Sequence, residues 1–470
     1  MKKLFASILL CIVSRACLSQ NTFDLSFIKS LGLQVVSITT QNGELPTCDY
    51  AEAPEGCMGF TCINQTKVPC RIVITMLNDT LYDSGEYEKS VSGATIKING
   101  NTSSFQNNKP YKLKLQKKAD LLIRNDNKYK DKNWRLLKEA YTLKTMIGLK
   151  VNELIGLPWT PRYRPCNVFL NGDYQGCYLL IESVERNSDC RLDVDKKTGY
   201  IVERDAYWWK EEYYFSTNYF EPYKGYRWTW KYPDEEDVTP EQKNYIKNYI
   251  NQAEESIKNG TYEKYIDVMS FARWMLAHDI MGTWDSGGSN LYVMKYDNTE
   301  NSLLQMANMW DFDTIFNVGE YKFSNYHNGD YDFYYPALFN SSNKTFVKTY
   351  KQLWDEIKPT LLEQLTDFIN QYAASEEAKA LQLSREQYSK RWNYEVESVD
   401  KNAQDAIAWF STHLKFLDEA ISQLNTETSI QNIHSDKDTD QQMYNLSGTK
   451  VNATNKNKIV IKGHKKYIYK

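Results

Sequence analysis

Alternating apolar and polar residues dominate the first part of the chain and predict β-strands. In residues 109–116 the apolar side chains would face one side of a strand, and Lys112 and Lys114 would face the other. Such a lysine-bearing face either lies in solvent or lines a site for anions, and the pattern alone fits both. Three further segments, 33–40, 71–77 and 94–98, also have the composition of strands.

A hairpin is predicted over residues 166–185, because two alternating runs flank the pair Asn171-Gly172. Asn-Gly is typical of a two-residue type I′ turn. In such a hairpin, residues whose numbers add to the same total as 171 and 172 face each other. Cys166 and Cys177 satisfy that sum, so the pattern predicts that they can pair across the two strands.

Helical spacing of apolar residues predicts a helix over residues 133–155, which Gly156 and Pro158 would end. Helical patterns dominate again from Thr239, where Thr and then Pro240 are typical of the first positions of a helix. The later helical patterns span residues 266–283, 344–357, 384–407 and 409–424.

Together the patterns predict an α+β protein with a β-rich lobe at about residues 31–200 and a mostly helical lobe at about 238–425. Residues 426–440 are polar and predict a linker. Residues 441–470 predict a short C-terminal β module of two or three strands.

The first residues read as a secretory signal peptide. Lys2 and Lys3 precede a short apolar run, which small residues follow, and we predict a leader of residues 1–19 with cleavage after Ser19. The alternative is a lipoprotein anchored through Cys17, although Arg15 fits a lipidation site poorly. We therefore expect a secreted, periplasmic or cell-surface protein. No later segment has the apolar length of a transmembrane helix.

Charge and composition narrow the classes of partner. The formal net charge of −3 gives no global field that would favour nucleic acid, so no nucleic-acid partner is expected. The 35 tyrosines and 12 tryptophans exceed the needs of a core, and such side chains can hold bases, sugars or peptides. Composition does not indicate an oligomeric state.

Seven of the nine cysteines follow the predicted leader, and in an exported protein such cysteines predict disulfides. Four of them, Cys48, Cys57, Cys62 and Cys70, are close in sequence and are expected to pair among themselves, with the connectivity open. A structural zinc site is the alternative, but the spacings lack the usual pair of cysteines two residues apart. Cys190 is left without an obvious partner.

The motif from residue 284 to 313 carries the candidate chemistry. Asp285 and Asn290 are five residues apart, and Asp311 and Asp313 follow one predicted hairpin later. Phosphoryl-transfer enzymes use one carboxylate to accept a hydroxyl proton, and an Asn and a second Asp to bind magnesium. Protein kinases space these residues similarly, although the usual His-Arg before the first Asp is absent here. The spacing also fits two turns around a hairpin.

These segments together resemble the spore coat protein H (CotH) kinase family, here as an exported bacterial member. The resemblance covers about residues 33 to 425. It rests on the turn and lysine strand at 98–115, the hairpin at 168–182, the helix that begins near Thr239, and the Trp-Asp-Phe-Asp motif that ends at Asp313. The resemblance implies a divergent two-lobed protein-kinase-like fold at about residues 20–425.

The resemblance also implies roles for individual residues. Asp285 corresponds to the catalytic Asp. Asn290, Asp311 and Asp313 form the expected metal group, for Mg²⁺ or Mn²⁺. The expected ATP-binding residues are Lys112, Lys114 and Glu182. The implied activity is transfer of the ATP γ-phosphate to Ser or Thr of a protein substrate.

Two departures from the family pattern bear on activity. Asn99 stands where the family usually has Arg, and an Arg expected near Met146 is missing. Lost arginines would weaken neutralisation of the phosphate charge. One alternative is therefore a weak or inactive kinase-fold protein that binds peptide or glycan through aromatic residues. Another is a glycoside hydrolase that uses Asp285 and Asp311 as a carboxylate pair.

Overall fold

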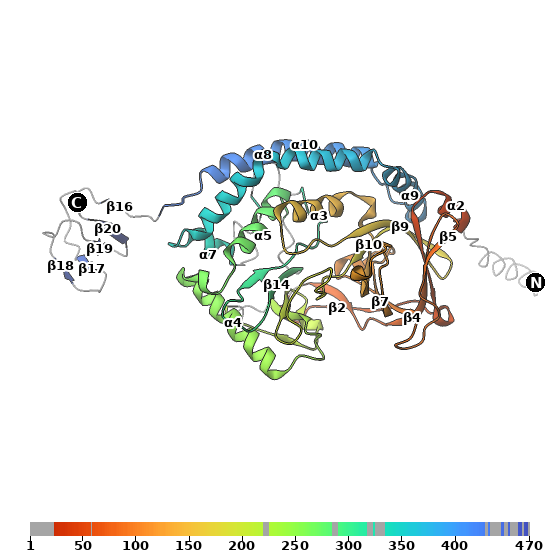
Figure 1. Cartoon of the computed structure of the whole chain (residues 1–470), viewed down its shortest axis with the longest axis horizontal. Helices are drawn as coiled ribbons and strands as arrows, with labels where there is room; N and C mark the ends of the chain where they lie inside the picture. Colours follow the sequence, from red (N-terminus) through yellow and green to blue (C-terminus); the bar gives the residue numbers. More distant parts are fainter. Residues whose placement is uncertain are drawn as a thin grey trace, which may run out of the picture.

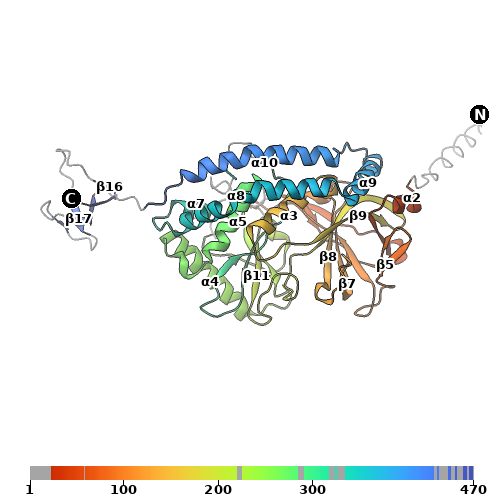
Figure 2. The ribbon, with the colours of Figure 1, turned by 45° about the horizontal axis from the view of Figure 1, so that its top comes forward.

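The computed structural model describes residues 23–57, 59–219, 225–283, 290–316, 323–324 and 334–427, together with five short strands between residues 431 and 468. Figure 1 shows a β-rich N-terminal part and a helix-rich C-terminal part. In Figure 2 the long helices α8 (Thr345–Ala373) and α10 (Val399–Ser422) run along one side of the molecule. The predicted α+β class, with strands first and helices later, is confirmed.

Seven strands of the N-terminal part close into a barrel. The order around it is β1-β9-β10-β8-β7-β6-β4, and an antiparallel pairing of β1 with β4 closes the ring. Its interior holds apolar side chains that include Val36, Leu113 and Trp134, all fully buried. The barrel strands are β1 (Gln34–Thr40), β4 (Val68–Met76), β6 (Ala94–Ile98), β7 (Tyr111–Ala119), β8 (Asp131–Leu137), β9 (Tyr163–Leu170) and β10 (Asp173–Glu182), and β5 (Asp79–Asp83) pairs with β4 outside the ring.

A second sheet of five antiparallel strands adjoins the candidate motif. β14 (Leu291–Lys295) begins directly after Asn290, and β15 (Leu304–Met306) leads to Asp311. Every residue of β14 is buried, so this strand holds Asn290, just before its start, in a fixed position. The remaining strands are β11 (Tyr200–Asp205), β12 (Tyr214–Phe215) and β13 (Arg227–Tyr232), in the order β12-β13-β11-β14-β15.

The helices pack around one apolar core with this sheet. α5 (Val268–Met281) is apolar over most of its surface and almost wholly buried, and it leads to Thr283. α3 (Lys144–Ile155) packs against α5 and α8. No helix in the described ranges is long and apolar enough to cross a membrane. The other helices are α2 (Leu25–Ser30), α4 (Pro240–Asn259), α7 (Tyr335–Asn340) and α9 (Glu376–Trp392).

Several predicted elements are confirmed. α4 begins with Thr239 as its cap and Pro240 in its first turn, and Thr239 and Gln242 form a reciprocal capping box. The predicted hairpin is the pair β9 and β10 around Asn171-Gly172. The C-terminal strands pair in a sheet of their own, but it has more than the two or three strands predicted, and one of them lies in the predicted linker. The strands are β16 (Gln431–Asn432), β17 (Met443–Asn445), β18 (Lys450–Val451), β19 (Ile459–Lys462) and β20 (Lys465–Ile468).

The predicted helix over residues 133–155 is wrong in its first half. Residues 131–137 form the barrel strand β8, a short 3-10 turn follows at Glu139–Tyr141, and the helix begins only at Lys144. Trp134 and Leu136 are two residues apart and both pack in the barrel interior, as period two requires. The helix prediction came instead from Leu136 and Ala140, which have helical spacing in the same run. Pairing with β7 and β10 decides the outcome in favour of the strand.

The predicted pairing of Cys166 with Cys177 is also wrong. A β-bulge between Tyr174 and Gly176 shifts the register by one residue, so that Cys166 lies opposite Tyr178. A one-residue shift turns a side chain to the other face of the sheet. Cys166 accordingly packs in the barrel interior, while Cys177 packs in the core under the helices. Gly176 adopts φ +110°, a conformation that favours glycine.

Candidate active site

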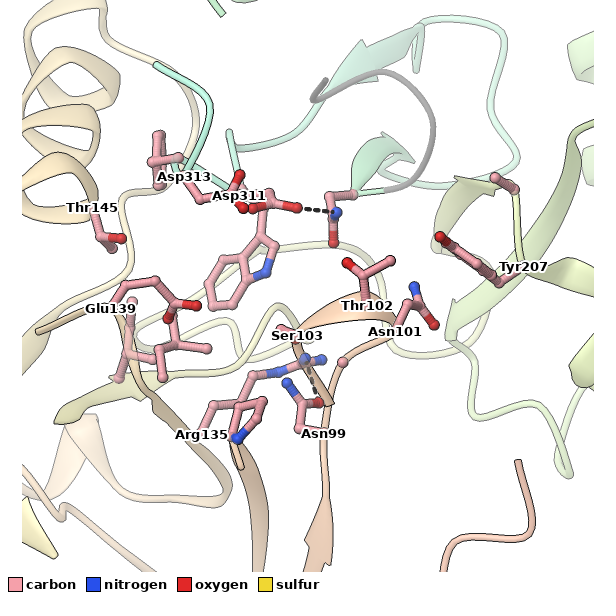
Figure 3. Close-up of a pocket in the computed structure, with 18 of the residues that line it drawn as sticks. Asn99, Asn101, Thr102, Ser103, Arg135, Glu139, Thr145, Tyr207, Asp311 and Asp313 are labelled. Carbon is pink, nitrogen blue, oxygen red and sulfur yellow. Dashed lines mark hydrogen bonds between the residues drawn. The ribbon is translucent and has the colours of Figure 1, made fainter. Parts of the chain in front are cut away.

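A cavity of about 290 Å³ lies where the barrel meets the second sheet. The loop between β6 and β7 forms one wall, and the chain that follows β15 forms another. Figure 3 shows Asp311 and Asp313 on one side of this cavity and Arg135 and Asn99 on the other. Its polar lining residues are Asn99, Asn101, Thr102, Ser103, Arg135, Glu139, Thr145, Tyr207, Asn290, Asp311 and Asp313.

The structure brings Asn290 and Asp311 together. The Asn290 side-chain nitrogen Nδ2 donates a hydrogen bond of 2.9 Å to Oδ2 of Asp311, drawn as a dashed line in Figure 3. Both residues have φ +68°, in the left-handed region that Asn and Asp tolerate better than most residues. Non-glycine residues held in this conformation are frequent at functional sites. The contact joins two residues that the sequence separates by a hairpin.

A buried carboxylate positions Asn290 from the second sheet. The backbone N–H of Asn290 donates to Oε1 of Glu203 at 2.7 Å, and Lys231 forms an ion pair with Oε2 of Glu203 at 2.7 Å. Burial, with the charge of Glu203 nearby, raises the pKa of the neighbouring Asp205 to about 6. Glu203 therefore supports the start of β14 and is itself held by Lys231.

Asp311, Phe312 and Asp313 are anchored from α3. The Lys144 ammonium donates to the backbone carbonyl of Asp313 at 2.7 Å. Asn152 of the same helix accepts a hydrogen bond of 2.9 Å from the backbone N–H of Met309, just before the motif. The Phe312 ring packs so closely over α3 that a Cβ atom at Gly148 would lie 2.1 Å from the ring unless the ring or the helix shifts. The helix thus sets where Asp311 and Asp313 stand.

Three basic residues form a row across the barrel strands. Lys97 of β6 lies opposite Lys112 of β7, which lies opposite Arg135 of β8. Arg135 lines both the central cavity and an adjoining one of about 390 Å³, while the two lysines line the adjoining cavity. Arg135 donates through Nη1 to Oδ1 of Asn99 at 2.9 Å, and its guanidinium lies 5.5 Å from the ring centre of Trp310.

Burial also affects the charge of this row. It lowers the pKa of Lys112 to about 8, even though 30% of the side chain is exposed to the cavity, and the ion pair with Glu185 at 3.7 Å only partly offsets this. Burial likewise lowers the pKa of Lys97. Crowding three cations on neighbouring strands favours an anionic ligand, because a bound anion would offset their mutual repulsion.

Six of the seven predicted site residues lie in the described part of the chain, and they fall into three groups. Asn290, Asp311 and Asp313 line the central cavity, and Lys112 and Lys114 line the adjoining one. Glu182 lies away from both: it is fully buried, accepts a hydrogen bond of 2.9 Å from the Arg162 backbone and pairs with Arg124 at 2.8 Å. Glu185, three residues later, is the carboxylate that pairs with Lys112. The predicted catalytic Asp285 lies outside the described residues.

Two residues that line the cavity, Arg135 and Glu139, were not predicted from the sequence. Arg135 stood inside a misassigned helix, and only its register with Lys112 reveals that it belongs to the basic row. Glu139 lines the cavity in the turn after β8, and burial raises its pKa to about 7. Glu139 also stood inside the misassigned helix, so no pattern in the sequence marked it as a cavity residue.

The donor set at Asn290 and Asp311 fits a magnesium ion. Magnesium prefers oxygen ligands and is commonly bound by one or two carboxylates together with phosphate oxygens and waters. The Asn290 amide donates its N–H to Asp311, which leaves its carbonyl oxygen as the acceptor atom. Within the described part of the chain, no group of three or more His, Cys, Asp or Glu side chains is arranged to hold a metal. A cation here would therefore share its coordination with ligand oxygens.

Comparison with known families decides the classification. The profile of the CotH kinase protein family matches residues 96–423. The chain belongs to the CotH kinase family. The match begins in β6, ends just after α10, and includes every residue named here in the central cavity's lining. Membership of this family supports the classification of the protein as a kinase-type transferase. No curated protein matches the chain.

Proposed function

We propose that this CotH family member is an ATP-dependent protein kinase that phosphorylates Ser or Thr of a protein substrate. The observation that carries the proposal is the pairing of Asn290 with Asp311 across a cavity from Arg135. Oxygen donors on one wall and a cation on the other suit a metal–triphosphate group. Membership of the CotH kinase family supports the same interpretation.

Each residue of the site would have a distinct role in phosphoryl transfer. Arg135 and Lys112 would bind phosphate oxygens, and Asn290 and Asp311 would hold the metal ion, with Asp313 supporting the backbone beside it. When bound, magnesium supplies neutralisation of the phosphate charge. Asp285 would orient the acceptor hydroxyl and take its proton as the new oxygen–phosphorus bond forms and the bond to the β-phosphate oxygen breaks. Positioning and electrostatics supply most of such catalysis.

Arg135 bears on the alternative of an inactive binding protein. That alternative was motivated by two arginines that the family usually has and this sequence lacks. Arg135 places a permanent cation beside Asn99, at the turn where the family Arg is expected. A guanidinium binds phosphate with paired, charge-assisted hydrogen bonds. The charge missing from position 99 is therefore supplied from the next wall of the same cavity.

A label-transfer assay tests the proposal. The mature chain would be incubated with radiolabelled ATP, magnesium or manganese, and a generic acceptor protein, beside Asp285→Ala and Asp311→Ala. We expect transfer by the wild type and loss of transfer, by a factor of about 100 or more, in both variants. Asp355→Ala is the matched control, because Asp355 is an exposed residue of α8 in a surface ion pair.

The other outcomes separate the alternatives. Absence of transfer and of any thermal shift with ATP would contradict the kinase proposal and favour the aromatic binding protein. Hydrolysis of glycans without ATP would favour the glycoside hydrolase. Transfer that survives in Asp311→Ala would show that the metal is held elsewhere.

Export is part of the proposal, and it rests on the sequence of residues 1–19. Expression of the full chain in a bacterial host and N-terminal sequencing of the product test it. We expect a mature chain that begins at Gln20. A lipidated N-terminus at Cys17 would instead support the lipoprotein alternative, and an intact Met1 would contradict export.

A further inference from the structure

A hairpin outside the matched family span supports one wall of the cavity. It comprises β2 (Asp49–Glu52) and β3 (Phe60–Ile63), which pair antiparallel. The Tyr50 hydroxyl donates to the backbone carbonyl of Ser104 at 2.7 Å, and the Thr61 hydroxyl donates to Oδ1 of Asn101 at 2.7 Å. Both acceptors belong to the loop between β6 and β7. The hairpin therefore holds the loop that lines the candidate active site.

Aromatic packing strengthens this contact. The rings of Tyr50, Phe60 and Phe105 lie within 4.7 to 5.9 Å of one another, centre to centre. Lys109 adds a bridge, since its ammonium donates to the Tyr50 hydroxyl at 3.1 Å and to the Ser104 carbonyl at 2.7 Å. A change that loosens the hairpin would thus reach the cavity loop through several contacts at once.

Two cysteines meet within this hairpin. Tyr50 lies opposite Cys62 in the hairpin. Cys48 is two residues before Tyr50, so its side chain lies on the same face of the hairpin as Tyr50 and is a diagonal neighbour of Cys62. Burial and then a side-chain interaction with Cys48 raise the pKa of the Cys62 thiol, and both side chains pack against the barrel cluster. Cys70 occupies a different place, in β4 between Thr40 of β1 and Ala94 of β6.

We propose that Cys48 and Cys62 form a disulfide that clamps the β2–β3 hairpin against the cavity loop. The oxidant is a disulfide compound, such as oxidised glutathione. The Cys48 thiolate attacks one sulfur of that disulfide and releases one thiolate. The Cys62 thiolate then attacks the Cys48 sulfur of the mixed disulfide and releases the second, so two protein thiols are oxidised and one disulfide is reduced to two thiols.

The order of attack follows from exposure. Cys62 is 1% exposed, and burial raises its pKa to about 11, whereas Cys48 is half-buried. The thiolate is the reacting form, and access to the oxidant limits the first step. The partly exposed Cys48 is therefore the entry point, and the buried Cys62 resolves the mixed disulfide from the adjacent position.

Peptide mapping of the full chain under non-reducing conditions tests the assignment. The chain would be fully reduced and then titrated with oxidised glutathione. We expect a cross-linked peptide that joins Cys48 to Cys62, present in Cys57→Ser and Cys70→Ser and absent in Cys48→Ser. A cross-link of Cys48 to Cys57, or of Cys62 to Cys70, would overturn the proposal. So would thiols that stay unlinked at excess oxidant.

Hydrogen exchange tests the clamp without reference to catalysis. Reduction should raise the exchange rate of backbone amides in residues 99–105 by about tenfold or more in the wild type. The same treatment should leave the already faster exchange of Cys48→Ser unchanged. If Cys62→Ser fails to fold because Cys62 is buried, Cys48→Ser still gives the answer. Equal exchange in oxidised and reduced wild type would refute the clamp even if the cross-link forms.

Discussion

The contact between Gly148 of α3 and the Phe312 ring offers a sharp perturbation of the candidate site. A Cβ atom added at Gly148 would lie 2.1 Å from Cδ1 and 2.6 Å from Cε1 of Phe312. Phe312 is only 4% exposed, so its ring cannot swing into solvent without opening the core. Because Phe312 sits between Asp311 and Asp313, a backbone shift that makes room for the added methyl group would displace both carboxylates.

The expected effects on stability and activity differ in size. Replacing a helical glycine with alanine gains about 1 kcal/mol from helix propensity. Overpacking a core costs about 1–3 kcal/mol, so Gly148→Ala should lower the free energy of unfolding by only about 0–2 kcal/mol. Misplacing catalytic groups by about 1 Å can reduce rates about 100-fold. Gly148→Ala should therefore lower kcat/KM for ATP by about 100-fold, or about 2.7 kcal/mol, which exceeds the expected loss in the free energy of unfolding.

The assay pairs steady-state phosphoryl transfer with urea unfolding for four proteins. These are the wild type, Gly148→Ala, Phe312→Leu, and the double variant. The smaller leucine should relieve the clash, so Gly148→Ala should cost much less activity in the Phe312→Leu background than in the wild type. Glu153→Ala, at an exposed position of the same helix, is the control. Full activity of Gly148→Ala with an unchanged free energy of unfolding would refute this reasoning.

Three further predictions concern charge and buried polarity. Burial raises the pKa of Glu139 from its ordinary value of 4.5 to about 7, so its ionisation reduces stability increasingly as pH rises through that window. Glu139→Gln should therefore raise the melting temperature more at about pH 8 than at about pH 5, and equal shifts would contradict this. Asn152→Ala should cost about 2 kcal/mol or more in urea unfolding, because it leaves the Met309 N–H and the Trp159 carbonyl buried without partners; a loss below about 0.5 kcal/mol would count against it. ATP affinity should fall as pH rises through about 8, where Lys112 loses its charge, and Lys112→Arg should remove that fall in a titration by calorimetry.

The strongest local signals predicted the fold well. Asn171-Gly172 fixed a hairpin, and the capping residues at Thr239 fixed the start of α4, because both are local devices with few alternatives. Residues 131–137 were assigned to a helix because period-two and helical patterns overlap in a short apolar run. Only pairing with β7 and β10 separates them, and pairing is a long-range property. Closure of the barrel by the pairing of β1 with β4 is also a long-range property, so local patterns in the sequence did not predict it.

The candidate site was predicted in part for a related reason. Asn290 and Asp311 were identified from spacing and family resemblance, and the structure joins them by a hydrogen bond. Arg135 was missed because its relation to Lys112 exists only in the barrel register. Glu182 was expected at the nucleotide, yet it lies against Arg124, since alternation along β10 was not enough to tell which acid faces the cavity. The bulge at Gly176 misled the cysteine pairing in the same way.

The central claim is that a metal–triphosphate group is held between the Asn290–Asp311 pair and Arg135. Calorimetric titration of ATP into the mature chain, with and without magnesium, measures this directly. Arg135→Ala should weaken ATP binding about tenfold or more in both conditions, because it removes a charge-assisted contact. Asp311→Ala should abolish the gain in affinity that magnesium gives, and Lys118→Ala, exposed on the same strand as Lys112, should change neither. Magnesium-dependent binding that is unaltered in both Arg135→Ala and Asp311→Ala would contradict the account.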